Sequence, residues 1–373
     1  MTFANCAAAL DEVAQTEKIK IHVETFAEGL SHPWGLAFLP DRTMLVTERD
    51  GRLRHVKDDG TLSEPIKGVP DVDARDQGGL LDIVLDPNFS ENRLVYLSFA
   101  EAGEGGDNST AVAKAALSED NTELTNVEVI FSQQPKLPST LHFGGRLVFD
   151  DAGHLFVALG ERSKEEFRGQ AQDLDSHLGK VVRINTDGSA PEDNPFVGQE
   201  GALPETWSLG HRNIQAAAIN PATGVLWEIE HGPLGGDELN VVQPGKNYGW
   251  PIVSFGVNYS GSPVGSGESE APKFEPPIYQ WTPVIAPSGM AFYGGRAFPE
   301  WEGNLFVGAL KETALVRLEL DGDRVTHEER ILDDTLPRIR DVVEGPDGAL
   351  YLLTDEDRGE ILRISPAEGD ATQ

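Results

Sequence analysis

A pattern of hydrophobic and polar positions recurs six times along the chain. In each copy, a short apolar strand is followed by a turn of Asp, Pro or Gly residues, a second apolar strand and a charged or Gly-rich loop. The six turns lie at Pro40, Pro87, Asp151, Pro221, Gly295 and Pro346. Their intervals average roughly 60 residues, which fits a four-stranded propeller blade with long loops. The repeat therefore predicts an all-β fold, a six-bladed β-propeller of four-stranded antiparallel blades.

Alternation of apolar and polar residues places the strands within the copies. The first two copies predict strands at 34–38, 43–47, 52–56, a weaker one near 65–69, then 81–85, 93–99, 111–117 and 127–132. The last copy predicts only three strands, at 341–343, 349–354 and 360–364. Segment 19–27 also alternates and has no partner of its own. We expect it to supply the missing strand and close the ring, rather than to remain an isolated edge strand.

No helix longer than two turns is expected, and segments 167–177 and 259–274 are expected to form long loops over one face. Residues 18–373 are interpreted as one propeller domain. Residues 1–17 are interpreted as an N-terminal tail, either the remnant of an export signal or a simple extension. Cys6 is the single cysteine, so no intrachain disulfide can form.

The charge balance excludes some partners. The chain carries 62 acidic and 30 basic residues, a net charge of −32, which argues against nucleic acid or an anionic membrane. No apolar run approaches the ~18–20 residues that span a bilayer, so membrane insertion is not expected. The expected state is a monomer or a homodimer that acts on a small molecule.

The position of a loop within the repeat predicts on which face of the propeller the loop lies. In an up-and-down blade, the loop entering the first strand and the loop joining the second and third strands lie on the same face. Polar residues at these two phases therefore converge, and they include Gln77, His142, Arg212, Asn213, Lys311, Arg338 and Arg340. A basic pocket in so acidic a chain predicts a small polyanionic ligand, because Arg matches carboxylates with two parallel hydrogen bonds.

Three of these positions carry more specific hypotheses. His142, followed by two glycines, is a candidate general base, although a hydrogen-bonded loop histidine is the alternative. Arg338 and Arg340 alternate, so both face one side of an extended segment, unless they are a solvated surface pair. Lys311 lies between apolar strands, which predicts a buried anionic partner.

A candidate Ca²⁺ site follows the fourth copy. The stretch Gly232-Pro-Leu-Gly-Gly-Asp-Glu-Leu-Asn, with Asn247-Tyr-Gly-Trp-Pro after it, offers backbone carbonyls and the carboxylates of Asp237 and Glu238. Its spacing is not that of an EF-hand, and a tight acidic turn is the alternative.

Several motifs taken together resemble a known family. The motifs are Gln77-Gly-Gly-Leu-Leu-Asp, His142-Phe-Gly-Gly-Arg-Leu, Leu178-Gly-Lys-Val-Val-Arg-Ile, Leu209-Gly-His-Arg-Asn, Glu230-His-Gly-Pro, Asn247-Tyr-Gly-Trp-Pro and Arg338-Ile-Arg-Asp. In this order, over roughly residues 25–366, the chain resembles the soluble sugar dehydrogenases that use pyrroloquinoline quinone (PQQ), most closely the aldose sugar dehydrogenase and glucose/sorbosone dehydrogenase branch. The family fold is a six-bladed propeller, and PQQ is a flat tricarboxylate.

The resemblance implies a role for each matching residue. His142 would take the proton of the sugar C1 hydroxyl while hydride passes to the quinone, and electrons would then go to an external acceptor. PQQ would be held by Gln77, Arg212, Asn213, Tyr259, Lys311, Arg338 and Arg340. One Ca²⁺ at the cofactor would bind the carbonyls of Gly232 and Pro233, and a structural Ca²⁺ would bind Glu238 and Tyr248. The product would be the lactone of an aldose, and close relatives imply a periplasmic or secreted location.

Two departures limit what the resemblance implies. Leu141 stands where the glucose dehydrogenase branch has an acidic residue, and the loop after Gly160 differs from that of relatives, so the preferred sugar is not carried over. Two other functions remain open. A Ca²⁺-dependent lactonase-type hydrolase would need carboxylates that point into the axis, and a propeller that only binds proteins would not need the cationic set.

Overall fold

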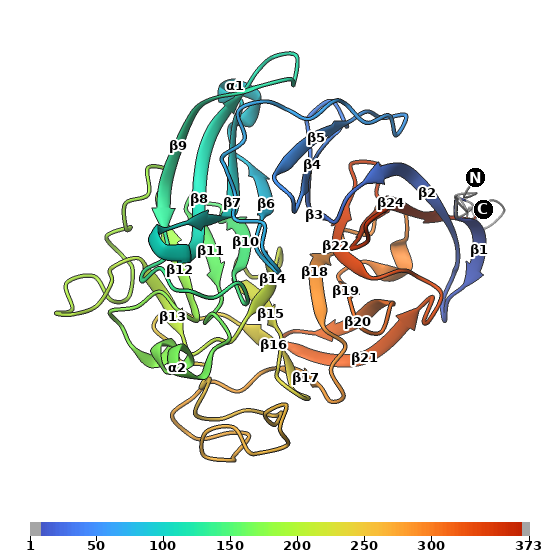
Figure 1. The fold of residues 1–373 in the computed structure, drawn as a ribbon. Coiled ribbons are helices and arrows are strands. Elements are labelled where there is room, and N and C mark those ends of the chain that lie inside the picture. Colours follow the sequence, from blue (N-terminus) through green and yellow to red (C-terminus); the bar gives the residue numbers. More distant parts are fainter. Residues whose placement is uncertain (1–8, 368–373) are drawn as a thin grey trace, which may run out of the picture.

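The computed structural model describes residues 9–367, which form six small antiparallel sheets around one axis (Figure 1). The first two blades contain β3 (Pro33–Phe38), β4 (Met44–Glu48), β5 (Arg52–Val56), β6 (Leu80–Leu85), β7 (Leu94–Ala102), β8 (Asn108–Leu117) and β9 (Leu124–Ser132). The next two contain β10 (Gly144–Phe149), β11 (Leu155–Leu159), β12 (Lys180–Ile184), β13 (Thr206–Leu209), β14 (Ile214–Ile219), β15 (Leu226–Glu230), β16 (Asp237–Val241) and β17 (Tyr279–Trp281).

The fifth and sixth blades complete the ring. They contain β18 (Pro287–Phe292), β19 (Leu305–Ala309), β20 (Leu315–Asp321), β21 (Arg324–Ile331), β22 (Ile339–Glu344), β23 (Leu350–Thr354) and β24 (Gly359–Pro366). The predicted turns all lie between the first and second strands of their blades. The six-bladed β-propeller that the repeat predicts is confirmed.

The N-terminal segment closes the last blade. Strand β2 (Lys20–Leu30) pairs antiparallel with β24, with Val23 opposite Ile364. The prediction that this segment supplies the missing strand is therefore confirmed. Strand β1 (Asp11–Gln15) adds a fifth strand outside β2, so the expected tail over residues 1–17 contains part of the blade. Residues 1–8, with Cys6, and residues 368–373 lie outside the described part of the chain.

The first blade departs from the prediction because it has three strands, without the fourth expected near 65–69. Pro65 and Pro70 flank this segment and cannot donate to a ladder. Gly68 has a φ of 80°, and a Cβ there would lie 2.2 Å from the carbonyl oxygen of Leu124. The segment therefore makes isolated contacts with both blades, a hydrogen bond from Ile66 N–H to the Leu53 carbonyl and a bridge between Lys67 and Glu123, rather than a continuous fourth strand.

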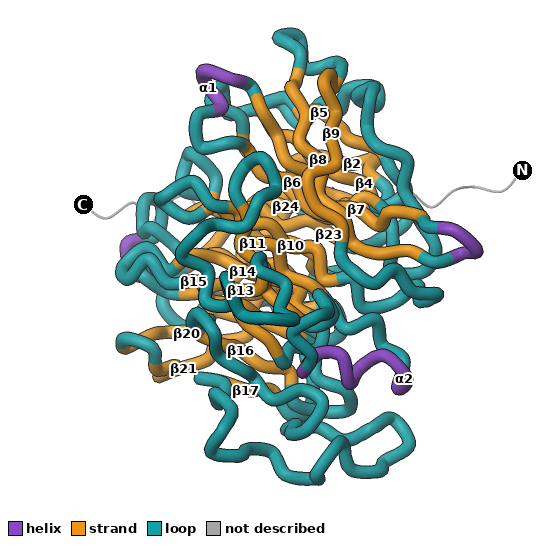
Figure 2. Tube along the Cα trace, turned by 90° about the vertical axis from the view of Figure 1, so that its left-hand side faces the viewer, coloured by secondary structure: helices purple, strands orange, loops and turns teal. Residues whose placement is uncertain are grey.

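Helices are short throughout the described residues, as predicted. They are α1 (Phe89–Asn92), α2 (Glu165–Arg168) and the 3₁₀ turns Glu104–Gly106, Gly169–Gln172 and Pro299–Trp301, which appear as small helical pieces among the strands and loops in Figure 2. The segment 167–177 is therefore partly helical rather than all loop. Within the described range, no helix is long and apolar enough to cross a membrane.

A charged triad lies on the axis where the innermost strands meet. Arg146 Nη1 lies 3.1 Å from Asp82 Oδ1 and 3.2 Å from Asp341 Oδ1, and all three side chains are at least nine-tenths buried. A Cβ on Gly35 would lie 2.6 Å from Asp82 Oδ1, and one on Gly289 would lie 2.1 Å from Asp341 Oδ1. Glycine at these two positions makes room for the carboxylates.

Candidate active site

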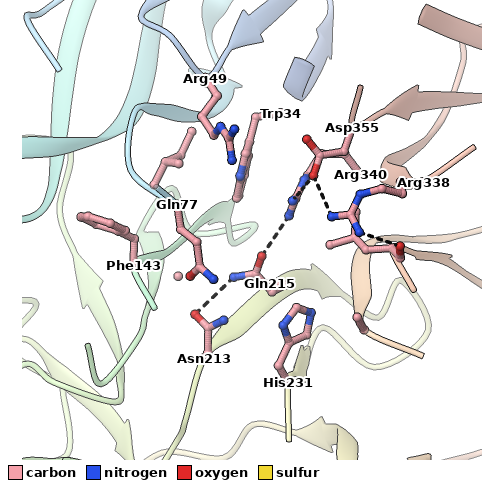
Figure 3. A pocket seen from close by; sticks show the side chains of 14 residues that line it. Trp34, Arg49, Gln77, Phe143, Asn213, Gln215, His231, Arg338, Arg340 and Asp355 are labelled. Atoms are coloured by element: carbon pink, nitrogen blue, oxygen red, sulfur yellow. Dashed lines mark hydrogen bonds and ion pairs between the residues drawn. The ribbon is translucent and has the colours of Figure 1, made fainter. Parts of the chain in front are cut away.

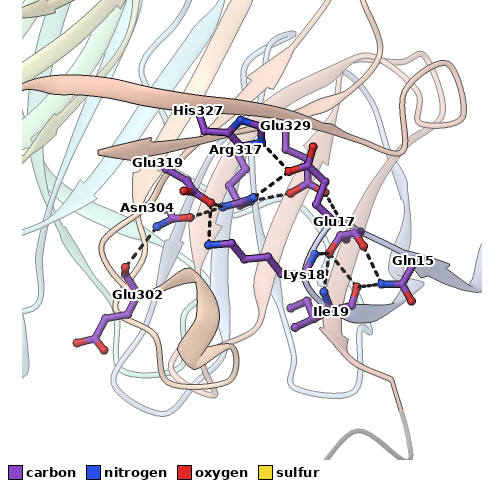
Figure 4. A network of polar contacts seen from close by, with 11 residues as sticks. Gln15, Glu17, Lys18, Ile19, Glu302, Asn304, Arg317, Glu319, His327 and Glu329 are labelled. Atoms are coloured by element: carbon purple, nitrogen blue, oxygen red, sulfur yellow. Dashed lines mark hydrogen bonds and ion pairs between the residues drawn. The ribbon is translucent and has the colours of Figure 1, made fainter. Parts of the chain in front are cut away.

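One axial cavity, of about 210 Å³, lies where residues from all six blades meet (Figure 3). It is lined by Trp34, Arg49, Gln77, Leu81, Phe143, Gly144, Asn213, Gln215, His231, Ala286, Leu310, Arg338, Arg340 and Asp355. Gln77, Asn213 and Arg338 come from loops that enter first strands, whereas Arg49 and Asp355 come from loops that join second and third strands. The prediction that these two loop sets converge on one face is confirmed.

The charged side chains of this cavity are three guanidinium groups and one carboxylate. Arg340 donates to Asp355 Oδ2 at 2.6 Å and to Gln215 Oε1 at 3.0 Å. Arg338 donates to the Leu310 carbonyl at 2.9 Å and lies 3.3 Å from Asp355. Within the described residues, the side chain of Arg49 has no hydrogen bond or ion pair. The cavity therefore has a positive excess, with Arg49 free to bind an anion.

Two amide side chains add neutral donors. Gln77 Oε1 accepts from the His142 backbone N–H at 2.8 Å, and Asn213 Oδ1 accepts from Gln215 Nε2 at 3.3 Å. Because these oxygens are already engaged, the amide NH₂ groups remain to donate to a ligand. A ligand with several oxygen acceptors and negative charge matches this donor set.

His142 lies beside the cavity, next to the lining residues Phe143 and Gly144. Its imidazole is buried, and Nδ1 lies 2.9 Å from Oε1 of Glu161, itself only 1% exposed. Burial and the nearby Arg212 guanidinium lower the pKa of His142, although Glu161 opposes this shift. The imidazole is therefore neutral near pH 7. Because Glu161 accepts the Nδ1 hydrogen, Nε2 keeps its lone pair and can act as a base.

A second, smaller cavity brings together the predicted metal ligands. Gly232, Pro233, Glu238 and Tyr248 line it together with Arg212. Arg212 Nη1 donates to the Gly232 carbonyl at 2.9 Å, so a guanidinium already supplies positive charge at this oxygen. The Tyr248 hydroxyl donates to the Val241 carbonyl at 2.6 Å, which leaves the backbone carbonyl of Tyr248 as its available metal ligand.

Next to this cavity, the acidic side chains of β15 and β16 gather around His211, whose pKa Glu228 and Glu230 raise to about 9 against the effect of burial. Glu230 and Glu238 are opposite each other on β15 and β16, and His211 Nδ1 lies 3.4 Å from Glu228 and 3.7 Å from Glu230. Burial, Glu230 and Glu228 together raise the pKa of Glu238 well above its usual range. Among the described atoms, Glu228 Oε2 and the side-chain oxygen of Asn240 are buried without a hydrogen-bond partner. This cluster fits a bound cation, which would offset the repulsion between carboxylates.

Three predicted cofactor residues are placed differently from what was expected. Arg212 lines the smaller cavity and is not among the residues that line the axial one. Lys311 is exposed next to the lining residue Leu310, so the prediction of a buried amine with a buried anionic partner is wrong; the side chain reaches solvent because it follows the strand end. Tyr259 is 76% exposed and is not among the residues that line the cavity. It lies in the long insertion, which does not follow the repeat.

Some lining residues were missed by the sequence reasoning. Trp34 and Gln215 belong to innermost strands, and His231 and Asp355 immediately follow second strands. For Trp34 and Gln215, the sequence signal that could have indicated a site role was a bulky or polar residue near the start of an innermost strand. The available signal for the second pair, His231 and Asp355, was its place in loops that join second and third strands, the loops that the repeat predicts to face the pocket.

Comparison with known proteins identifies the family. The model for the glucose/sorbosone dehydrogenase family matches residues 30–363. The chain is 50% identical over 348 residues to the aldose sugar dehydrogenase YliI of Escherichia coli K12, with 93% of each protein covered. A crystal structure of a glucose dehydrogenase is 53% identical, with a TM-score of 0.90 over 92% of this chain and 99% of that chain.

A more distant structure carries the cofactor. The PQQ-bound aldose sugar dehydrogenase of Streptomyces coelicolor is 28% identical, with a TM-score of 0.77 over 97% of this chain and 100% of that chain. The resemblance seen in the motifs is therefore confirmed along almost the whole length. The chain belongs to the glucose/sorbosone dehydrogenase family and is a sugar dehydrogenase of its PQQ-type propeller class.

Proposed function

We propose that this protein is a PQQ- and Ca²⁺-dependent dehydrogenase that oxidises the C1 hydroxyl of aldose sugars to the lactone and passes the electrons to an external acceptor. The observation that carries the proposal is the axial cavity, which is lined by three guanidinium groups and by Gln77, the residue that accepts a hydrogen bond from the backbone of the buried, neutral His142. Such a pocket in a chain of net charge −32 matches a small polyanion together with a base. Relatives that are named as aldose and glucose dehydrogenases support the sugar class.

The donor set fits PQQ. Its carboxylates would bind Arg49, Arg338 and Arg340, and its remaining oxygens would accept from the amides of Gln77 and Asn213. Lys311 would reach the ligand over the rim, with its stem along Leu310. Tyr259 is left out of the proposed set because its side chain lies in solvent. When bound, PQQ supplies the hydride acceptor, and the protein supplies position and charge.

His142 is the proposed general base. Nε2 would accept the proton of the C1 hydroxyl, and Glu161 would hold the Nδ1 hydrogen and stabilise the imidazolium that forms. The lowered pKa of His142 keeps the base unprotonated at neutral pH. Arg212, close to the same imidazole, would stabilise the negative charge that develops on the quinone when it is reduced.

Calcium has two proposed places. At the cofactor, the carbonyls of Gly232 and Pro233 would bind one ion, which requires the Arg212 guanidinium to turn from the Gly232 carbonyl toward the ligand. The second, structural ion would bind Glu238 and the carbonyl of Tyr248, next to the acidic cluster. The surplus of buried carboxylates supports this second site.

The test is reconstitution. Purified protein that has been freed of metal is titrated with PQQ and Ca²⁺, and dye reduction is followed with glucose and other aldoses. We expect a change in the visible spectrum of PQQ on binding and sugar-dependent dye reduction that needs both additions. His142→Ala should retain PQQ binding and lose turnover by ~10²–10⁴-fold. If PQQ does not bind and no aldose is oxidised, the proposal is wrong.

The residues of the cavity fit the two alternative functions less well. A lactonase-type hydrolase needs axial carboxylates free to hold a metal, but Asp355, the one carboxylate that lines the cavity, is bound by arginines. A propeller that only binds proteins gives no reason for a buried histidine–glutamate pair beside a cationic cavity. We also propose a periplasmic or secreted location, by resemblance to exported relatives, which cell fractionation would test.

A further inference from the structure

Asp355 has an unusual position for a residue at an anion site. It directly follows β23, its residue is 6% exposed, and it is the one carboxylate among the side chains that line the axial cavity. A negative charge there repels an anionic ligand. If Asp355 acted only through its charge, the pocket would bind a tricarboxylate more tightly without it.

The contacts of Asp355 indicate a different role. Oδ2 accepts from Arg340 Nη2 at 2.6 Å and lies 3.3 Å from Arg338 Nη2, while Oδ1 lies 2.9 Å from His32 Nδ1. Burial alone would raise the pKa of Asp355, but Arg340, His32 and Arg338 outweigh it, and the pKa lies well below its usual range. The carboxylate is therefore ionised and engaged on both oxygens.

The two arginines depend on this carboxylate for their orientation. Among the described residues, the Arg340 guanidinium has one other hydrogen-bond partner, Gln215, and lies 5.9 Å from the centroid of the Trp34 ring, while its Nε is buried without a hydrogen-bond partner. Within residues 9–367, the Arg338 side chain has one other hydrogen bond, to the Leu310 carbonyl. Long side chains that lose a fixed partner regain rotamer freedom, which must be lost again when a ligand binds. Figure 3 shows both guanidinium groups beside Asp355 at one side of the cavity.

We propose that Asp355 is a positioning residue for the bound cofactor: it holds Arg338 and Arg340 in the orientation that binds the carboxylates of PQQ, and its benefit to binding exceeds its own repulsion. This inference rests on the proposed function, because PQQ is the ligand. The inference predicts that removal of Asp355 weakens the binding of PQQ, whereas charge repulsion alone predicts that it strengthens binding.

The test is the PQQ affinity of Asp355→Ala, measured by titration of the visible absorbance of PQQ at fixed Ca²⁺. We expect the Kd to rise tenfold or more, although the pocket becomes more positive. At saturating PQQ, turnover with an aldose should return to within a few-fold of wild type, because Asp355 does not contact the reacting atoms. Asp355→Asn, which keeps one acceptor oxygen, should give an intermediate Kd.

A matched control removes the same charge nearby. Asp357 lies on the outer side of His32, 2.8 Å from Nε2, and its side chain is 97% exposed. Asp357→Ala should leave the Kd for PQQ unchanged within about twofold. Thermal unfolding without PQQ identifies variants that fail to fold; if Asp355→Ala fails, the milder Asp355→Asn decides the outcome.

The outcomes are distinct. Normal PQQ binding by wild type, with equal or tighter binding by both Asp355 variants, overturns the positioning role and leaves the proposed function intact. An absence of PQQ binding by wild type overturns both. A weaker Kd that saturating PQQ does not rescue in turnover would place Asp355 in the chemical step and also contradict the inference.

Discussion

The substitution Glu161→Gln tests the histidine–glutamate pair directly. Glu161 uses both oxygens: Oε1 lies 2.9 Å from His142 Nδ1, and Oε2 accepts from the Ser163 backbone N–H at 2.6 Å. Glutamine has one acceptor oxygen, so it cannot serve both donors. If its oxygen stays with Ser163, its NH₂ group faces Nδ1, which must then accept. This arrangement favours the tautomer with its hydrogen on Nε2, so a smaller fraction of the imidazole has an Nε2 lone pair that can take a proton.

The size of the effect follows from the same contacts. A hydrogen bond to a charged group contributes about 1.5–3 kcal/mol, and 1.36 kcal/mol corresponds to one unit of pKa. The imidazolium that forms in the reaction loses this stabilisation, so turnover should fall by roughly 10- to 150-fold. Glu161 raises the pKa of His142, so its neutral replacement should shift the acid limb of kcat/KM to lower pH by about one to two units.

The assay is the pH profile of dye reduction from pH 4.5 to 9 with PQQ, Ca²⁺ and sugar in excess. Wild type should have its acid limb below the ordinary imidazole range, since burial and Arg212 lower the pKa of His142. Glu165→Gln removes the same charge from the same loop at a side chain that is 89% exposed, and it should leave the profile unchanged. An unchanged plateau in Glu161→Gln, or an acid limb that moves to higher pH, would refute the reasoning.

Three further predictions concern stability. Ile21→Ala in the closing strand should lower the free energy of unfolding by about 2–5 kcal/mol in urea titrations, whereas the exposed neighbour Lys20→Ala should change it little; equal effects would contradict the closure role. Arg146→Met should cost about 3–5 kcal/mol, and the loss should grow as pH rises toward neutrality. The direction of this pH dependence follows from Asp82, whose pKa in the folded state is raised to about 6 mainly by burial. Because the unfolded state loses this proton at lower pH, the free energy of unfolding falls as pH rises. Without Arg146 this fall should be steeper. Melting temperatures that lack this excess slope would refute it. Removing Ca²⁺ with a chelator should lower the melting temperature of wild type more than that of Glu238→Gln, and equal shifts would exclude Glu238 as a ligand.

The architecture was largely predictable from the sequence because a repeat constrains every copy at once. Alternation located the strands, and the turns gave the blade number even though individual turns differ in residue type. The prediction of a fourth strand in the first blade was wrong because prolines and a glycine with positive φ determine the path of that segment. Their effect depends on contacts with the neighbouring blade. Strand β1 was missed because its weak alternation becomes meaningful only against β2.

The candidate site was partly predictable for a related reason. Loop phase brought Gln77, Asn213, Arg338 and Arg340 to one cavity, since their positions follow from the blade geometry. The exposure of Lys311 could not be predicted in the same way. A residue after the end of a strand points inward or outward according to the course of its loop, and flanking apolar residues do not determine that course.

The pairing of β2 with β24 also has a consequence for the order of folding. It joins residues as far apart in the chain as Ile21 and Pro366, and contacts of such long range form slowly because a very large loop must close first. The five blades built from consecutive strands can assemble as the chain emerges, but the last blade must wait for its partner from the opposite end. Ring closure is thus expected to be the final and slowest step, and any chain interrupted before β24 would leave β2 to find a strand in another molecule.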